Sequence, residues 1–271
     1  MANFTKIAKA AGLGLALTLA GQAQASVINV GGVNWDPDAF IDFTAQSDLY
    51  EKNVNAVGDV LYGVGVVTSL NGQSVVNFCP GCQLTFEFGY TVAEVGDFDT
   101  NGTVDVIFDN GYLNFYVDST TTGTNFDFTD VSTAVDGALW LGLVGHTDFD
   151  PLLGKSGQLF GELDAGFALT ANNEEGKGSG LLDVAAGAAG GLAAGNFDTN
   201  TRDDFFAANV ADFNFTSEFQ PFVNGGTTAD GLALAGTGTL LGSSIPEPGS
   251  LALLGLGLLG LGGSVMKRRK A

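Results

Sequence analysis

Apolar and polar side chains alternate along most of the middle of the chain. The clearest alternating runs are residues 83–88, 103–108, 112–117 and 211–216. Because successive side chains of a strand point to opposite faces, this alternation predicts antiparallel strands that each bury one face. Long helical periodicity is missing, since glycines interrupt the Ala-rich stretch at residues 185–194 and weaken any helix there. The pattern predicts an all-β body, built as an antiparallel β-sandwich or a jelly-roll-like fold.

Asn-Gly pairs interrupt these runs at residues 71–72, 101–102, 110–111 and 224–225. Asn and Gly adopt positive φ more readily than other residues, as the type I′ turn of a two-residue hairpin requires. The clearest case is residues 104–118, where Asn110-Gly111 joins two alternating runs. The sequence therefore predicts a β-hairpin with its turn at Asn110-Gly111.

The N-terminal residues have the order of a secretory signal peptide. Lys6 and Lys9 give a positive start, residues 10–20 an apolar centre, and Ala23-Gln24-Ala25 a cleavage site with small residues at both ends. A membrane anchor is the alternative, but the apolar run is short for a membrane span. We expect signal peptidase to remove residues 1–25, so that the mature chain begins at Ser26.

The C-terminal residues contain a Pro-Glu-Pro motif, an uncharged stretch and a basic cluster, in that order. The motif is Pro246, Glu247 and Pro248, and the basic cluster is Lys267, Arg268, Arg269 and Lys270. The 18 uncharged residues 249–266 are long enough for a helix of about 27 Å, close to the thickness of a hydrocarbon core. The sequence predicts a single C-terminal apolar helix with its basic end in the cytoplasm. A permanent single-pass anchor is the alternative to a segment that is held briefly and removed.

The chain thus divides into four predicted parts. Residues 1–25 are the signal peptide and residues 26–223 the β-sandwich body. Residues 224–245 are rich in Gly, Thr and Ser, so we expect them to tether the body to the tail. Residues 246–271 hold the motif, the transmembrane helix and the basic tail.

The tail, residues 245–270, resembles the PEP-CTERM sorting domain. Such tails occur on exported proteins of Gram-negative bacteria that make extracellular polysaccharide, and a membrane enzyme, the exosortase, is thought to recognise and process them. The resemblance implies export through the inner membrane to the cell surface or extracellular matrix. It also implies that the exosortase is a partner, and that the chain contacts the membrane only through the C-terminal helix before processing.

Acidic residues outnumber basic residues, with 30 Asp and Glu against 10 Lys and Arg and a net charge of −20. We expect no nucleic-acid partner, because nucleic acid requires a basic face. The hydrophobic fraction of 45% is too high for a disordered acidic chain. A single His and two Cys exclude most metal clusters built from these residues.

Cys79 and Cys82 enclose Pro80-Gly81. In an exported protein such a pair is typical of a short disulfide that closes a turn. A redox pair requires a helix after the first Cys, and the sequence predicts a strand there instead. A metal site remains a further alternative, but two thiolates alone do not complete a tetrahedral zinc site.

Asp97, Asp99, Asn101 and Asp105 have the spacing of a calcium-binding loop. Oxygen ligands at every second position, followed by a Gly turn, can converge on one hard cation. The departure from an EF-hand is at its twelfth position, where Phe108 replaces Glu. A local turn is the alternative, because Asp, Asn and Gly also favour turns. Calcium is the only cofactor that the sequence suggests.

The remaining candidate chemistry is sparse. His146 is the only His, and no G-x-S-x-G motif accompanies it, so we expect no enzyme activity. A polysaccharide-modifying enzyme that uses two carboxylates stays an alternative. Several aromatic side chains could grip a sugar face, although a core role suits them better; they are Trp35, Tyr50, Tyr62 and Tyr90.

A second resemblance concerns a flocculation-associated group of PEP-CTERM proteins. It rests on several short motifs within residues 28–220, namely Val30–Asp38, Tyr62-Gly63, Asn71-Gly72, Phe78–Cys82, Gly180–Val184 and Asn196–Asn200. The resemblance implies a protein that holds cells and extracellular polysaccharide together in flocs, and it supplies no catalytic residues. A calcium- or carbohydrate-binding module without a role in flocculation is the alternative.

Overall fold

The computed structural model describes residues 27–37, 43–119, 123, 125–164, 174–223 and 225–245. All of them belong to one compact unit, Val27–Ile245, while the other unit consists of Met1–Ser26 and Pro246–Ala271. The predicted signal peptide and the predicted sorting segment therefore lie outside the described residues.

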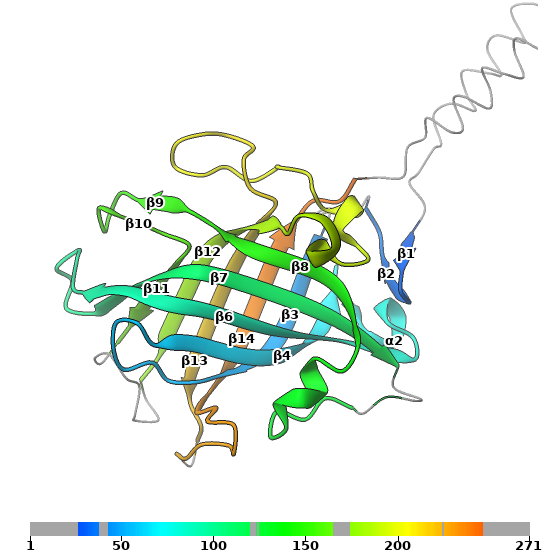
Figure 1. Ribbon diagram of the computed structural model, residues 1–271, viewed down its shortest axis with the longest axis horizontal. Coiled ribbons are helices and arrows are strands. Elements are labelled where there is room, and N and C mark those ends of the chain that lie inside the picture. Colours follow the sequence, from blue (N-terminus) through cyan, green and yellow to red (C-terminus); the bar gives the residue numbers. More distant parts are fainter. Residues whose placement is uncertain are drawn as a thin grey trace, which may run out of the picture. The chain divides into compact units, whose positions relative to one another are not determined.

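Antiparallel strands make up most of the described part (Figure 1). The strands are β1 (Ile28–Val30), β2 (Val33–Trp35), β3 (Phe43–Glu51), β4 (Val60–Leu70), β5 (Gln73–Ser74), β6 (Cys82–Gly96), β7 (Val104–Ser119), β8 (Ala138–His146), β9 (Asp148–Asp150), β10 (Lys155–Gly157), β11 (Leu159–Leu163), β12 (Gly176–Val184), β13 (Phe213–Pro221) and β14 (Leu234–Gly242). The helices are short: α2 (Val75–Phe78) and the 3-10 turns η2 (Val131–Ala134), η3 (Gly187–Gly190) and η4 (Ala194–Asn196).

The main sheet closes on itself to form a barrel. Hydrogen-bonded neighbours follow the order β7, β6, β4, β3, β14, β13, β12 and β11, and β11 pairs back onto β7. These eight strands of the described part therefore form a closed ring. Strand β11 pairs with only one part of β7 and one part of β12. Strand β8 pairs with another part of each of these two strands. In Figure 1, β6, β7 and β8 cross over β12, β13 and β14.

The prediction of an all-β body is confirmed, but the prediction of a β-sandwich or jelly-roll-like fold is wrong. A sandwich needs two separate sheets, whereas the pairing of β11 with β7 joins the two ends of one sheet. Alternation of apolar and polar residues is the same in both architectures, because each strand buries one face in either case. Closure depends on pairing between Leu159–Leu163 and Val104–Phe108, which local alternation does not encode.

The predicted hairpin at residues 104–118 is also wrong, because these residues form the single long strand β7. Asn110 has the expected positive φ of 53°, but it produces a bulge in place of a turn. The partner strand β6 shifts register there, with Thr91 opposite Asp109 and Gly89 opposite Tyr112. A positive-φ residue at a bulge bends a strand without ending it.

Residues 225–245 do not form the predicted tether. They contain β14, which pairs along its whole length with β13 on one side and β3 on the other. Alternation is weak in β14 because Gly236, Gly238 and Gly242 replace side chains at several of its positions. The Gly-rich composition of this segment is typical of a linker, although the segment contains a strand that the barrel requires.

A group of buried aromatic rings fills part of the barrel core. Its rings belong to Trp35, Phe43, Trp140, Phe197 and Phe213, with neighbouring centroids as close as 4.6 Å. Both indole N–H groups have partners, as buried Trp requires. Trp140 donates to the Val30 carbonyl at 3.0 Å and Trp35 to the Ser244 hydroxyl at 3.1 Å. These bonds attach the β1–β2 hairpin and the end of the described chain to the core.

Among the described residues, no helix is both long enough and apolar enough to cross a membrane. The predicted C-terminal apolar helix is thus not found in the described part, and residues 249–266, which were to form it, lie outside that part.

Candidate functional site

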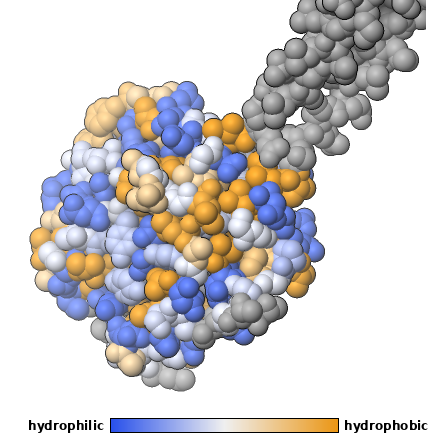
Figure 2. Space-filling view, turned by 45° about the vertical axis from the view of Figure 1, so that its right-hand side comes forward, coloured by the Kyte–Doolittle hydropathy of each residue, from blue (hydrophilic) through white to orange (hydrophobic). Residues whose placement is uncertain are grey.

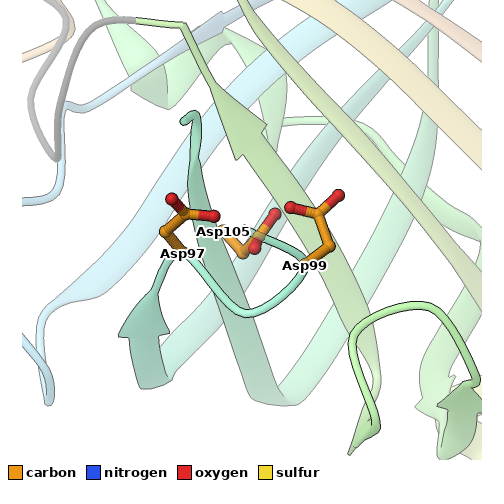
Figure 3. Close-up of side chains that lie close together, drawn as sticks. All are labelled: Asp97, Asp99 and Asp105. Atoms are coloured by element: carbon orange, nitrogen blue, oxygen red, sulfur yellow. The ribbon is translucent and has the colours of Figure 1, made fainter. Parts of the chain in front are cut away.

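The loop between β6 and β7 brings together most of the residues predicted to bind calcium. One carboxylate oxygen from each of Asp97, Asp99 and Asp105 lies within 4.8 Å of the others. Figure 3 shows the three side chains on one side of the loop, with Asp105 between the other two. Asp97 is exposed, whereas Asp105 is only 2% exposed.

Hydrogen bonds within the loop hold these carboxylates in place. Asp105 accepts the backbone N–H of Phe98 at 2.8 Å, and Asp97 accepts that of Gly102 at 3.2 Å. Thr100 and Gly102 adopt positive φ of 61° and 92°, which turns the chain so that β7 begins opposite β6. Asp105 pairs across the ladder with Gly96, and this pairing explains why residues eight positions apart meet.

Asn101, the fourth predicted ligand, makes hydrogen bonds within the loop, and its side-chain N–H donates to Asp99 at 2.8 Å. Its side-chain oxygen accepts the backbone N–H of Thr103 at 2.8 Å and the Thr103 hydroxyl at 2.5 Å. Phe108, at the twelfth position of the motif, is 5% exposed and lies in the barrel core. Calcium takes six to eight oxygen ligands, so three carboxylates fit a partly hydrated ion and differ from the cage of an EF-hand.

Cys79 and Cys82 form a disulfide with their Cα atoms 5.0 Å apart. The pair closes the turn between α2 and β6, and both residues are buried. The helix α2 precedes Cys79, and a strand begins at Cys82. The pair therefore lacks the following helix that lowers the pKa of a redox cysteine.

A shallow groove of about 530 Å³ crosses the outer face of β11, β12, β13 and β14. Ser179, Thr216 and Thr239 lie side by side on three of these strands. The next row contains Lys177, Glu218 and Thr237. Asp99 and Asp105 also line the groove, so the candidate calcium loop lies at its border.

A second hollow of about 360 Å³ continues this groove. The two share Asp150, Leu152, Phe160 and Ser179 in their walls. Phe149 lines the second hollow, and its ring lies 5.0 Å from that of Phe205 and 5.9 Å from that of Phe206. We name Phe149, Phe205 and Phe206 the aromatic cluster; Phe205 is 53% and Phe206 72% exposed.

His146 contacts the loop that carries Phe205 and Phe206 of the aromatic cluster. Its Nδ1 lies 2.8 Å from Asp183 and its Nε2 lies 3.3 Å from Asp204. Asp204 also accepts the backbone N–H of Phe206 at 2.8 Å, and Asp148 accepts that of Phe205 at 2.8 Å. Burial lowers the pKa of His146, but hydrogen bonds and charges of the two aspartates outweigh it and leave the pKa above 6.5. An imidazole that contacts one carboxylate through each ring nitrogen suits a structural link between the two aspartates.

The aromatic residues singled out from the sequence lie elsewhere. Trp35 and Tyr90 are buried in the core, at 3% and 2% exposure. Tyr50 is half-buried and stacks on Phe128 with centroids 4.4 Å apart. Tyr62 is also half-buried. The aromatic cluster was missed, although the adjacent Phe205-Phe206 pair between Asp and Ala residues breaks the alternation of a strand and marks an unusual loop.

One buried carboxyl group lies inside the barrel. Glu51 is 2% exposed, and its Oε1 has no hydrogen-bond partner in the described part. It borders an interior cavity of about 30 Å³ that is lined mainly by apolar residues such as Phe88, Phe108 and Phe215. Burial raises the pKa of Glu51 to about 8. A cavity of this size holds about one water molecule.

Hydrophobic and hydrophilic residues are mixed over the face shown in Figure 2, with one group of hydrophobic residues near its centre. Apolar side chains that are more than half exposed include Val27, Val76 and Leu192, in addition to the aromatic cluster. Scattered exposed apolar residues are ordinary in a folded protein. The aromatic cluster differs because its rings touch one another beside a polar groove.

Comparison with protein families identifies the tail. The model of the PEP-CTERM protein-sorting motif matches residues 244–269, which confirms the predicted sorting segment. Neither a curated protein nor a solved structure matches the chain. The motif implies export across the inner membrane of a Gram-negative bacterium towards the cell surface, with processing by an exosortase.

Proposed function

Because the chain carries a PEP-CTERM sorting motif and is thus an exported, exosortase-processed protein, we propose that it serves at the cell surface or in the extracellular matrix and promotes flocculation with extracellular polysaccharide. The sorting motif is the observation that carries the proposal, since it directs the acidic barrel out of the cell. The proposed role is structural and contains no catalytic step.

The properties of the barrel support this role. A closed ring of strands leaves few unpaired edges, so it resists uncontrolled pairing between neighbouring molecules. A disulfide and a buried aromatic core suit a protein that must stay folded outside the cell. Its polar outer groove offers hydroxyl and carboxylate groups that can contact a sugar polymer.

The settled volume of cell aggregates tests the proposal. Three strains are compared: wild type, a gene deletion, and a strain in which Pro246, Glu247 and Pro248 are replaced by alanines. We expect the second and third strains to stay dispersed while they make as much polysaccharide as wild type. Normal flocculation of the deletion strain would refute the proposal.

We propose calcium binding at the loop of Asp97, Asp99 and Asp105 as a second function. The observation that favours it is the convergence of three carboxylates that the sequence spacing predicted. A bound calcium ion also offsets part of the negative charge of an acidic protein, because it carries two positive charges.

A repeated tetrapeptide provides a matched control for the calcium proposal. Phe-Asp-Thr-Asn occurs at residues 98–101 and again at residues 197–200, so Asp99→Asn and Asp198→Asn make the same change in the same local sequence. A ligand of the native state raises its stability, by about 2.7 kcal/mol at a hundred times the Kd. We expect calcium to raise the melting temperature of wild type and of Asp198→Asn, and not of Asp99→Asn. Equal responses of the two variants would refute the site.

A further inference from the structure

We propose that the groove over β11–β14 and the aromatic cluster together bind one polysaccharide chain, whose sugars carry amino groups and few carboxylates. This inference rests on the proposed function, which makes extracellular polysaccharide the partner, and it names the surface and the class of sugar.

The aromatic cluster is the first argument. Hydrogen bonds from the backbone N–H groups of Phe205 and Phe206 to Asp148 and Asp204 fix this part of the loop. Both phenylalanine side chains are exposed to solvent. Asp204 is in turn bound to His146. Fixed aromatic rings that remain exposed and touch one another form the kind of apolar patch that marks a binding surface. Rings of this kind pack against the C–H face of a sugar and bury apolar area there.

The row of hydroxyl groups is the second argument. Within the described residues, the hydroxyls of Ser179, Thr216, Thr237 and Thr239 form no hydrogen bonds. They lie on adjacent strands of the groove. From β11 to β14 the groove crosses three strand intervals and is about 14 Å wide, the length of a short oligosaccharide. Such a row can exchange hydrogen bonds with successive sugar hydroxyls.

The charge of the groove selects the type of sugar. Besides Asp99 and Asp105, the candidate calcium ligands, three carboxylates line the described part of the groove, those of Asp150, Glu162 and Glu218, against the single ammonium of Lys177. The negative groove would repel the carboxylates of a uronic acid polymer, whereas it would attract the protonated amino groups of an amino sugar polymer. The two hollows share walls, so one chain can lie along the groove and reach the aromatic cluster.

Isothermal titration calorimetry on the purified full chain tests the inference, with three hexasaccharides as probes: glucosamine, glucose and galacturonic acid. We expect the glucosamine hexasaccharide to bind most tightly and the galacturonic acid hexasaccharide most weakly. Phe206→Ala should weaken the first by about tenfold, because it removes an aromatic contact. Glu218→Gln should weaken it by about threefold, as expected for one exposed charge pair.

Control variants separate the site from general effects. Phe206→Tyr keeps the ring and should bind like wild type. Val76→Ala removes an apolar side chain that is 75% exposed and does not line the groove, and Asp198→Asn removes an exposed acid elsewhere; neither should change binding. Melting curves establish that every variant is folded.

The outcomes distinguish this inference from the proposed function. Binding by wild type that survives Phe206→Ala and Glu218→Gln would overturn the groove as the site. Absence of binding to all three sugars, or tightest binding of the galacturonic acid probe, would overturn the inference as well. The settled-volume experiment decides the matrix role independently, since a deletion strain that flocculates normally would refute that role even if the groove binds sugar.

Discussion

Replacing the buried Glu51 by Gln should stabilise the protein at neutral pH. The Glu51 side chain lies within the barrel beside a small apolar cavity, and its Oε1 has no partner in the described part. Burial raises its pKa from 4.5 to about 8, because the interior disfavours the charged form. Gln has almost the same shape as protonated Glu and never ionises.

The magnitude follows from proton linkage. A group whose pKa is raised on folding contributes its full stability below the unfolded pKa of 4.5, and the contribution is lost as the pH rises towards 8. At pH 7 the unfolded carboxyl is ionised while the folded one holds its proton. The difference between pH 7 and 4.5 is about 2.5 units, which corresponds to about 3 kcal/mol. Glu51→Gln escapes this loss, so its advantage over wild type should be absent at pH 4 and about 3 kcal/mol at pH 7.

Urea denaturation of the full chain at pH 4, 5.5, 7 and 8 measures this effect. Glu218→Gln makes the same chemical change on the exposed outer face, and such surface changes stay within about 0.5 kcal/mol. The unfolding free energies of wild type and Glu51→Gln should diverge as the pH rises, while Glu218→Gln should follow wild type. Parallel curves for wild type and Glu51→Gln across this range would refute the reasoning.

Three other variants test further parts of the structure by urea and thermal denaturation. His146→Gln should lower the melting temperature more at pH 6 than at pH 9, since stability from a raised pKa is lost as the pH rises through that pKa. Cys79→Ser should cost about 2 kcal/mol, because it frees a four-residue loop in the unfolded chain. Gly111→Ala should cost about 3 kcal/mol, because the new Cβ would lie 2.0 Å from Cε1 of Tyr90. A variant whose unfolding matches wild type at every pH would contradict the role given to that residue.

The sequence was informative where the signal is local. The sorting motif is a linear pattern, so it was recognised without any structure and the family comparison confirms it. Alternation indicated an all-β body because it reports the two faces of each strand. The three carboxylates of the calcium motif converge because one turn between β6 and β7 holds them all.

Features that depend on distant residues could not be predicted. Closure of the barrel requires β11 to pair with β7, and the groove combines outward positions of four strands. His146 meets Asp183 and Asp204, which are 37 and 58 residues away. Asn110-Gly111 shows a further limit, since positive φ serves a bulge as well as a turn.

The location of the protein tests the central claim most directly. The extracellular polysaccharide is collected from wild-type cells and from cells in which Pro246, Glu247 and Pro248 are replaced by alanines. After washing, the amount of this protein in each polysaccharide fraction is measured by immunoblotting. We predict that the protein is abundant in the wild-type fraction and absent from that of the variant. Equal amounts in both, or protein found only free in the medium of wild-type cells, would contradict a sorted protein that acts together with polysaccharide.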